Sequence, residues 1–359
     1  MNWKRVLRPW YHRALRLHRR ILLVFGKLLF SPNRISSKIV FSYSPGGKFD
    51  GLGAQLQRVL GINALGDYWN IKIQHDFITD IAIHPLDEIQ KSKDFSVFLR
   101  SVNYVVGAFP IEVSESNTLY FNELRFRNVI QLFFASWWKG GKILAKITHP
   151  YFFVDANPDI YLCESNNLFA MRLKEFRTRN LSNGIALHHR QGVGNMAVQP
   201  GQRTPREISE DGYLQVLPTY LQRKSHSYLY VFTDAPETNI EFTPPVSQRD
   251  SWVGLPTFDG KKMSISPNAL AGLTSFKEIR IEIFRGGNPL ESLANMASCS
   301  VLILSRSSFG YVAALLNNQA EVWLPNDFWH RPMSGWKTYI PVMTTKPRKN
   351  RAMHHKISL

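Results

Sequence analysis

A buried strand that ends in ionisable side chains carries the clearest chemistry in this sequence. Residues 184–187 are apolar and lead directly into His188, His189 and Arg190, after which Gly192 turns the chain. Ligands of open α/β folds sit at the carboxyl ends of strands. A guanidinium stays charged and presents its donors in a fixed fork that suits phosphate. We therefore predict that Arg190 binds a diphosphate.

Two further predicted strands also end in polar side chains. Residues 228–232 lead into Asp234, and residues 301–304 lead to Ser307 and Ser308 at the start of a predicted helix. The ends of parallel strands emerge at one edge of a sheet, so these side chains are expected to converge. Serine hydroxyls and a helix N-terminus suit an anion, whereas a carboxylate suits a sugar hydroxyl. Each residue alone fits a structural role as ion pair, cap or turn former, and their combination favours a site.

A glycine-rich turn near the start of the chain is the second candidate ligand contact. It separates a predicted strand at 38–43 from a predicted helix at 54–67 and includes Gly51 and Gly53. Such a turn brings backbone N–H groups close to a ligand, although glycine also serves the turn itself. Leu56 stands where a dinucleotide fingerprint has its third glycine, and no Gly-Lys-Ser/Thr ending follows. A dinucleotide fold and a P-loop are therefore disfavoured.

The alternation of strands and helices predicts an α/β protein with two parallel layers. Apolar runs at 95–99, 104–106 and 129–134 are buried segments whose type the pattern leaves open. The predicted division is a basic amphipathic helix and linker at 1–37, a first Rossmann-like domain at 38–178, a second at 179–345 and a basic tail at 346–359.

The composition is that of a globular protein with a large basic excess. Of 359 residues, 44% are apolar and 20% are charged, and 44 Lys and Arg against 27 Asp and Glu give a formal charge of +17. This excess suggests an anionic partner: nucleic acid, a phosphate-bearing ligand or an anionic membrane. Eleven Lys or Arg precede Asp50, the first acidic residue, and the tail is basic again. No nucleic-acid-binding motif is present, so nucleic acid is not a predicted partner.

Residues 1–30 have the pattern of a basic amphipathic helix, which Pro9 either interrupts or begins. Its apolar stripe comprises Trp3, Leu7, Trp10, Ala14, Leu17, Ile21, Val24 and Leu28. The apolar run at 21–30 is shorter than the ~20 residues that span a bilayer, and no small-residue cleavage site follows it. We expect a cytoplasmic protein whose helix either lies on an anionic membrane or packs on the protein's own body.

The two cysteines, Cys163 and Cys299, have neither cysteine nor histidine at metal-ligand spacing. This pattern disfavours a zinc site. We predict two buried free thiols in a reducing compartment.

Four motifs, in order, resemble those of the α1,2-fucosyltransferases of glycosyltransferase family 11. Asp50-Gly-Leu-Gly-Ala-Gln-Leu56 resembles their Gly-Gly-Leu-Gly-Asn-Gln-Leu opening. His188-His-Arg-Gln-Gly192 resembles their His-x-Arg-Arg-Gly-Asp motif, which α1,6- and protein O-fucosyltransferases share more loosely. Tyr230-Val-Phe-Thr-Asp234 resembles their Val-Phe-Ser-Asp strand. Met296-Ala-Ser-Cys-Ser to Ser305-Arg-Ser-Ser-Phe309 resembles their Met-Ser-x-Cys to Asn-Ser-x-Phe segment.

The resemblance implies a GT-B fold, with two Rossmann-like domains facing a cleft, and direct inverting transfer from GDP-fucose to a glycan hydroxyl without a metal or other cofactor. Consistent with this, no two aspartates form an Asp-x-Asp motif. Arg190 would hold the β-phosphate and stabilise the departing charge. The other implied donor contacts are His188 to the nucleoside, Ser307, Ser308 and Phe309 to the phosphates, Asp234 to a sugar hydroxyl, Glu291 as an approximate match to the family's acidic residue, and Gly51 and Gly53 across the cleft.

The chain also departs from the family pattern. Gln191 and Val193 stand where the family has its second arginine and its aspartate, and Ala54 replaces an asparagine. A GT-B enzyme with another nucleotide sugar and a non-catalytic protein that binds anionic glycans therefore stay open as alternatives. The catalytic base is left open among Asp234, Glu291 and His189.

Overall fold

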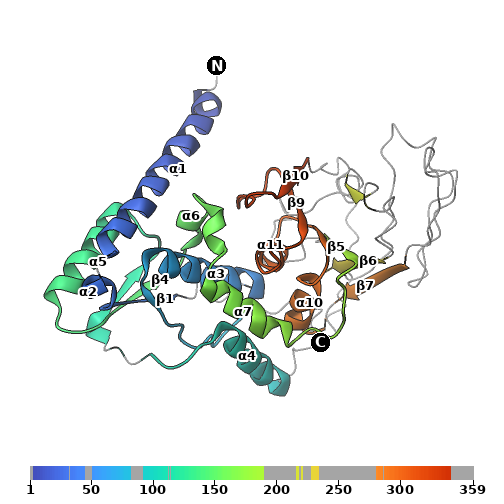
Figure 1. Cartoon of the computed structure of the whole chain (residues 1–359), viewed down its shortest axis with the longest axis horizontal. Helices are drawn as coiled ribbons and strands as arrows, with labels where there is room; N and C mark the ends of the chain where they lie inside the picture. Colours follow the sequence, from blue (N-terminus) through green and yellow to red (C-terminus); the bar gives the residue numbers. More distant parts are fainter. Residues whose placement is uncertain are drawn as a thin grey trace, which may run out of the picture.

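Two parallel β-sheets, one in each half of the chain, form the framework of the protein (Figure 1). The computed structural model describes residues 3–31, 33–44, 51–81, 92–111, 113, 115–189, 216–217, 220, 228–233, 280–285 and 287–340. Arg190 and Asp234 lie outside this part of the chain. The predicted α/β class with two Rossmann-like parallel layers is confirmed.

The first sheet has four described strands: β1 (Ile39–Tyr43), β2 (Lys72–Ile73), β3 (Thr118–Phe121) and β4 (Ile143–Ile147). Their order is β2-β1-β4-β3 and every pair is parallel. The helices around it are α2 (Asn33–Ser36), α3 (Leu52–Trp69), α4 (Ser92–Val106), α5 (Phe126–Trp138), α6 (Tyr151–Val154) and α7 (Glu164–Lys174), with 3-10 turns at Glu115–Asn117 and Pro158–Tyr161.

The second sheet has six described strands: β5 (Gly184–His189), β6 (Tyr228–Thr233), β7 (Arg280–Arg285), β8 (Val301–Ile303), β9 (Glu321–Pro325) and β10 (Lys337–Tyr339). Their order is β10-β9-β8-β5-β6-β7, again parallel throughout. β5 lies between β6 and β8, and all six of its residues are buried, which explains its continuous apolar run. The described helices are α10 (Pro289–Met296) and α11 (Ser308–Leu315).

The helices of the second unit begin where the sequence places caps. The Asn288 side chain accepts a hydrogen bond from the Leu290 backbone N–H at 2.9 Å, and Pro289 occupies the first helical position. Ser307 caps α11 in the same way, accepting from the Phe309 N–H at 3.3 Å. These caps satisfy backbone donors that have no partner within the helix, and they fix where each helix starts.

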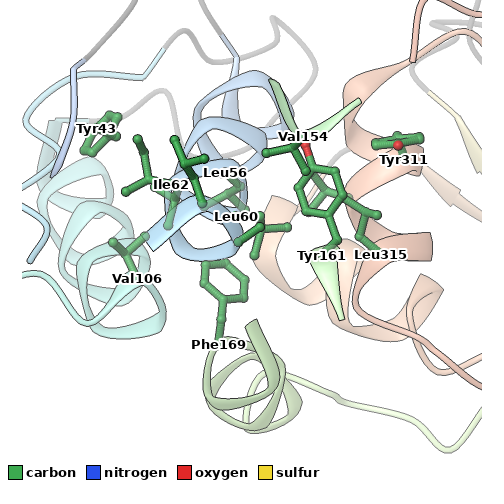
Figure 2. Close-up of a cluster of buried hydrophobic side chains, with 14 of the residues drawn as sticks. Tyr43, Leu56, Leu60, Ile62, Val106, Val154, Tyr161, Phe169, Tyr311 and Leu315 are labelled. Carbon is green, nitrogen blue, oxygen red and sulfur yellow. The ribbon is translucent and has the colours of Figure 1, made fainter. Parts of the chain in front are cut away.

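Helix α3 is the element on which the two halves meet. Nearly all of its residues are buried, including the polar Gln55, Gln57 and Arg58, as expected for a helix enclosed by protein. It contacts β1, α6 and α7 of its own half and α11 of the other. Figure 2 shows Leu56 and Leu60 of α3 beside Tyr161, with Tyr311 and Leu315 of α11 close by. A single apolar core therefore extends through both halves.

The apolar runs whose type the sequence left open are helices. Residues 95–99 and 104–106 both belong to α4, and residues 129–134 belong to α5. On α5, Val129 and Leu132 are buried while other apolar side chains stay exposed. Short apolar runs do not distinguish a strand from a buried helix, which is why the pattern was ambiguous here.

The N-terminal helix α1 (Trp3–Phe30) runs through position 9 without a break, so neither predicted effect of Pro9, an interruption or a helix start, occurs. Side chains at 1–12 lie outside the described part. Leu22, Leu23 and Phe30 are buried on the protein body, and the Trp69 indole donates a hydrogen bond to the Leu23 carbonyl at 2.8 Å. Of the two alternatives, the second half of α1 packs on the protein's own body, but through residues outside the predicted apolar stripe. No described helix is long and apolar enough to cross a bilayer.

Both cysteines are free thiols, as predicted. Cys299 is buried and Cys163 is half-buried. Burial raises the pKa of the Cys163 thiol to about 12 and raises that of Cys299 as well. Neither residue therefore has the thiolate character of a reactive cysteine.

A buried histidine on the carboxyl side of β2 is held neutral by the fold. His75 Nε2 donates to the Asn63 side-chain oxygen at 2.8 Å, and only 4% of the residue is exposed. Burial and the nearby Arg172 lower the pKa of His75 from 6.5 to about 3. In the folded protein the His75 ring therefore stays neutral, whereas in the unfolded chain it takes up a proton below pH 6.5.

We expect His75 to make the protein acid-sensitive. Its contribution to stability is present above pH 6.5 and is lost as the pH falls towards 3. Between pH 7 and pH 4.5 this amounts to about 3 kcal/mol. Urea unfolding at both pH values should show a smaller loss for His75→Gln than for the wild type. His18→Gln, at an exposed position on α1, should keep the wild-type loss; equal losses in all three proteins would contradict the assignment.

Candidate functional site

The carboxyl end of β5 carries the predicted His188, His189 and Arg190 sequence. Both histidines are buried, with 8% of His188 and 4% of His189 exposed. The next residue, Arg190, and Asp234 after β6 lie outside the described residues. Their predicted contacts to a diphosphate and a sugar hydroxyl therefore stay predictions.

His188 is packed beneath the first turn of α11. Its Nδ1 lies 2.7 Å from the Ser305 hydroxyl, and its ring centroid lies 6.0 Å from that of Phe309. A Cβ at position 310 would come within 2.9 Å of the same Nδ1, so Gly310 permits this close approach. The structure thus brings the end of β5 together with the end of β8, as the parallel arrangement predicts. A contact from His188 to a nucleoside stays a prediction.

His189 faces the other neighbouring strand. Its Nδ1 lies 3.2 Å from the Thr233 hydroxyl, at the last residue of β6. The two residues are also paired in register between β5 and β6. The ends of three adjacent strands, β8, β5 and β6, are therefore joined by side-chain contacts of two consecutive histidines.

The start of α11 offers features suited to an anion. Ser307 is buried and caps the helix, while Ser308 and Phe309 are partly exposed. The helix dipole and the N–H groups of the first turn favour negative charge here. Binding of phosphates by Ser307, Ser308 and Phe309 stays a prediction.

A buried arginine beside this turn escaped the sequence analysis. Arg306 donates to the two carboxylate oxygens of Asp327, with Nε 2.8 Å from Oδ1. The Arg306 side chain is 4% exposed, whereas that of Asp327 is half exposed. The fork geometry of guanidinium and carboxylate fixes the turn between Ser305 and Ser307. The sequence shows Arg306 between Ser305 and Ser307, but it does not indicate that Asp327 is the ion-pair partner.

The glycine turn meets the same helix start from the other half of the protein. A Cβ at position 53 would lie 2.5 Å from the Phe309 backbone nitrogen and 2.6 Å from its Cα. Gly53 therefore allows α3 and α11 to touch backbone to backbone, a packing role that the sequence did not reveal. Gly51 precedes α3 and its carbonyl accepts from the Ala54 and Gln55 N–H groups at 3.0 and 3.2 Å. A contact of either glycine with a donor stays a prediction.

Glu291 lies in the first turn of α10 and its carboxylate accepts from the Thr178 hydroxyl at 2.6 Å. Thr178 belongs to the segment that leads into β5. No described hydrogen bond joins Glu291 to His188 or to the first turn of α11. Its predicted place in the donor site is therefore supported by sequence order alone.

A hydrogen-bonded chain crosses between the two halves next to the site. The Gln57 amide nitrogen on α3 donates to His330 Nε2 at 2.7 Å, and His330 Nδ1 donates to Asp155 at 2.8 Å. Close by, Asp159 accepts from the Ser334 N–H at 2.8 Å and from its hydroxyl at 2.6 Å. These contacts fix the first half of the protein against the loop after β9. They join residues far apart in sequence, so no local pattern indicated them.

The described part of the chain holds no group of three or more His, Cys, Asp or Glu side chains able to bind a metal ion. The prediction of metal-independent chemistry rests on the sequence.

Comparisons with known proteins found likenesses in structure alone. No protein-family profile matches the chain, and no curated protein matches it in sequence. One similar structure is the Escherichia coli heptosyltransferase WaaC with ADP-2-deoxy-2-fluoro heptose, at 9% identity and a TM-score of 0.36 over 84% of this chain and 92% of that one. Another is POFUT1 in complex with GDP, at 11% identity and a TM-score of 0.34 over 79% and 95%. At these scores, neither likeness assigns a donor, an acceptor or a catalytic residue to this chain.

Proposed function

We propose that this protein is an inverting, metal-independent glycosyltransferase of the GT-B type that transfers fucose from GDP-fucose to a glycan hydroxyl. The observation that carries the proposal is the junction of β5, β8 and the first turn of α11 around His188. Arg190 follows this junction by two residues. The described parts of the four motifs that resemble α1,2-fucosyltransferases belong to this junction, to neighbouring β6 and to the start of α3, which touches it at Gly53, and this supports the proposal.

In the proposed reaction, an acceptor hydroxyl attacks C1 of the donor sugar while the bond from C1 to the β-phosphate oxygen breaks. The acceptor proton passes to a base and GDP leaves with its negative charge. The first turn of α11 would receive the phosphates, and Arg190 would neutralise the departing oxygen. The base stays open among Asp234, Glu291 and His189. Of these, His189 bonds the Thr233 hydroxyl through Nδ1, and one Glu291 oxygen accepts from the Thr178 hydroxyl.

A nucleotide-sugar panel tests this function. GDP and GDP-fucose are expected to raise the unfolding temperature, because a ligand that binds only the folded state at 100 times its Kd adds about 2.7 kcal/mol. Slow release of GDP from GDP-fucose, unchanged by EDTA, should accompany binding. Stabilisation by a UDP- or ADP-sugar alone would replace fucose with another donor. No response to any nucleotide sugar would favour the non-catalytic anionic-glycan-binding protein.

A further inference from the structure

Helix α1 leaves its most regular apolar stripe in solvent. Leu17, Ile21, Val24 and Leu28 recur at spacings of four, three and four, which places them on one face. Between 52% and 69% of each of these residues is exposed. The helix packs on the protein through other residues, including Leu22 and Leu23. The stripe is therefore a second apolar face that the protein's own core does not use.

Helix α5, which packs against α1, carries further exposed apolar side chains. Phe25 of α1 stacks on Phe126 of α5, with ring centroids 5.1 Å apart. Figure 1 shows α5 beside the C-terminal part of α1, and the two helices are in contact. Trp137 is 74% exposed and Trp138 is 85% exposed. We call the α1–α5 surface the set Leu17, Ile21, Val24 and Leu28 with Phe126, Phe134, Trp137 and Trp138.

Aromatic contacts hold the α5 side chains in place. Phe134 stacks on Trp138 at 6.0 Å, and Phe133 contacts both Phe134 at 5.7 Å and Trp137 at 6.3 Å. The inward face of this helix is already buried through Val129 and Leu132. Two adjacent tryptophans that are largely exposed on an ordered helix mark an interaction surface rather than scattered surface residues.

The charges on the two helices are of one sign, and the nearby Glu123 is paired with Arg125 just before α5. Neither α1 nor α5 contains an acidic residue. Arg13, Arg20 and Lys27 recur every seven residues along the edge of the stripe and are exposed. Two of them also contact the protein: Arg20 donates to the Ala156 carbonyl at 2.8 Å, and the Lys27 ammonium lies over the Tyr68 ring. On α5, Arg127 is exposed next to Phe126. A second copy of the chain docked here would bring like charges together, which disfavours a homodimer.

We propose that the α1–α5 surface seats the protein on the interface of an anionic phospholipid bilayer. Exposed leucine and isoleucine side chains would enter the acyl boundary, tryptophans would lie at the headgroup level, and the flanking cations would meet lipid phosphates. The first half of α1, which extends away from the rest of the protein in Figure 1, continues the same helix. This inference goes beyond the proposed function and does not depend on it.

Vesicle sedimentation of the full chain tests the proposal. The wild type is expected to bind vesicles of phosphatidylcholine with phosphatidylglycerol, to bind phosphatidylcholine alone weakly, and to lose affinity as salt rises. Trp137→Ser with Trp138→Ser should lower the partition coefficient at least about tenfold, as should Ile21→Ser with Val24→Ser. Absence of the wild type from anionic vesicles, or wild-type binding by both double variants, would overturn the proposal.

A matched control lies on α7, which packs on α3, α4 and α10. Leu168 and Met171 there are 46% and 62% exposed, and their double serine variant should bind vesicles like the wild type. Exposed substitutions of this kind change stability little, and circular dichroism with urea unfolding checks that each variant is folded. Light scattering tests whether a second copy of the chain covers the surface instead. The surface would be assigned to a second copy if the wild type were a dimer, the tryptophan variant a monomer, and neither bound vesicles.

Discussion

Gly53→Ala is expected to lower the free energy of unfolding by about 3 kcal/mol or more. The new Cβ would lie 2.5 Å from the Phe309 nitrogen and 2.6 Å from its Cα, both backbone atoms that have no rotamer to change. The sign is diagnostic, because glycine to alanine within a helix otherwise stabilises by about 1 kcal/mol. Here the clash between α3 and α11 outweighs the gain in helix propensity. Urea unfolding followed by circular dichroism measures the difference.

Gly140→Ala is the matched control. Position 140 precedes β4, and no atom lies within 4 Å of the Cβ that alanine would add. The stability of this variant should stay within about 0.5 kcal/mol of the wild type. A Gly53→Ala protein as stable as Gly140→Ala would show that α3 and α11 do not meet backbone to backbone.

The layered architecture could be predicted because its signals are local. Continuous apolar runs such as 184–187, followed by turns and helical periodicity, indicate buried parallel strands. The Asn288 and Ser307 caps likewise appear in the sequence immediately before their helices. The prediction that Pro9 interrupts or begins α1 was wrong. Proline usually disrupts a helix interior, but this helix continues through it.

The choice of which face a helix buries could not be predicted in the same way. The regular stripe of α1 suggested the face that would be used, but the protein packs through Leu22, Leu23 and Gly26. Trp69 of α3 decides this, because its ring lies where a side chain at Gly26 would stand and its indole bonds the Leu23 carbonyl. Periodicity reveals apolar faces, and tertiary packing selects between them.

The candidate site was predictable at its strand ends and unpredictable across the chain. Parallel pairing of β5 with β6 and β8 brings His189 to Thr233 and His188 to Ser305, as the position of each residue at a strand end implied. The contact of Gly53 with Phe309 joins positions more than 200 residues apart. Such contacts depend on how two complete α/β units dock, which no short motif specifies.

The second large effect concerns catalysis. Under the proposed function, Arg190→Ala should lower kcat for fucosyl transfer by about 100- to 1,000-fold, because it removes a preorganised donor aimed at charge that develops on the β-phosphate. Arg190→Lys should recover part of the loss, since an ammonium keeps the charge but lacks the bidentate fork. Steady-state kinetics with GDP-fucose measure the loss of kcat, and calorimetric titration measures the binding of GDP.

The control for charge removal is Arg100→Ala, at an exposed position on α4. It removes one positive charge, as Arg190→Ala does, and should keep wild-type kinetics, because isolated surface charges are screened at physiological salt. His188 belongs to the same junction, since its Nδ1 contacts Ser305 directly before the first turn of α11. If Arg190→Ala turned over GDP-fucose as fast as Arg100→Ala, the phosphate role of Arg190 would be wrong. The leaving group would then have to be stabilised at the first turn of α11, where Ser308 and Phe309 are partly exposed.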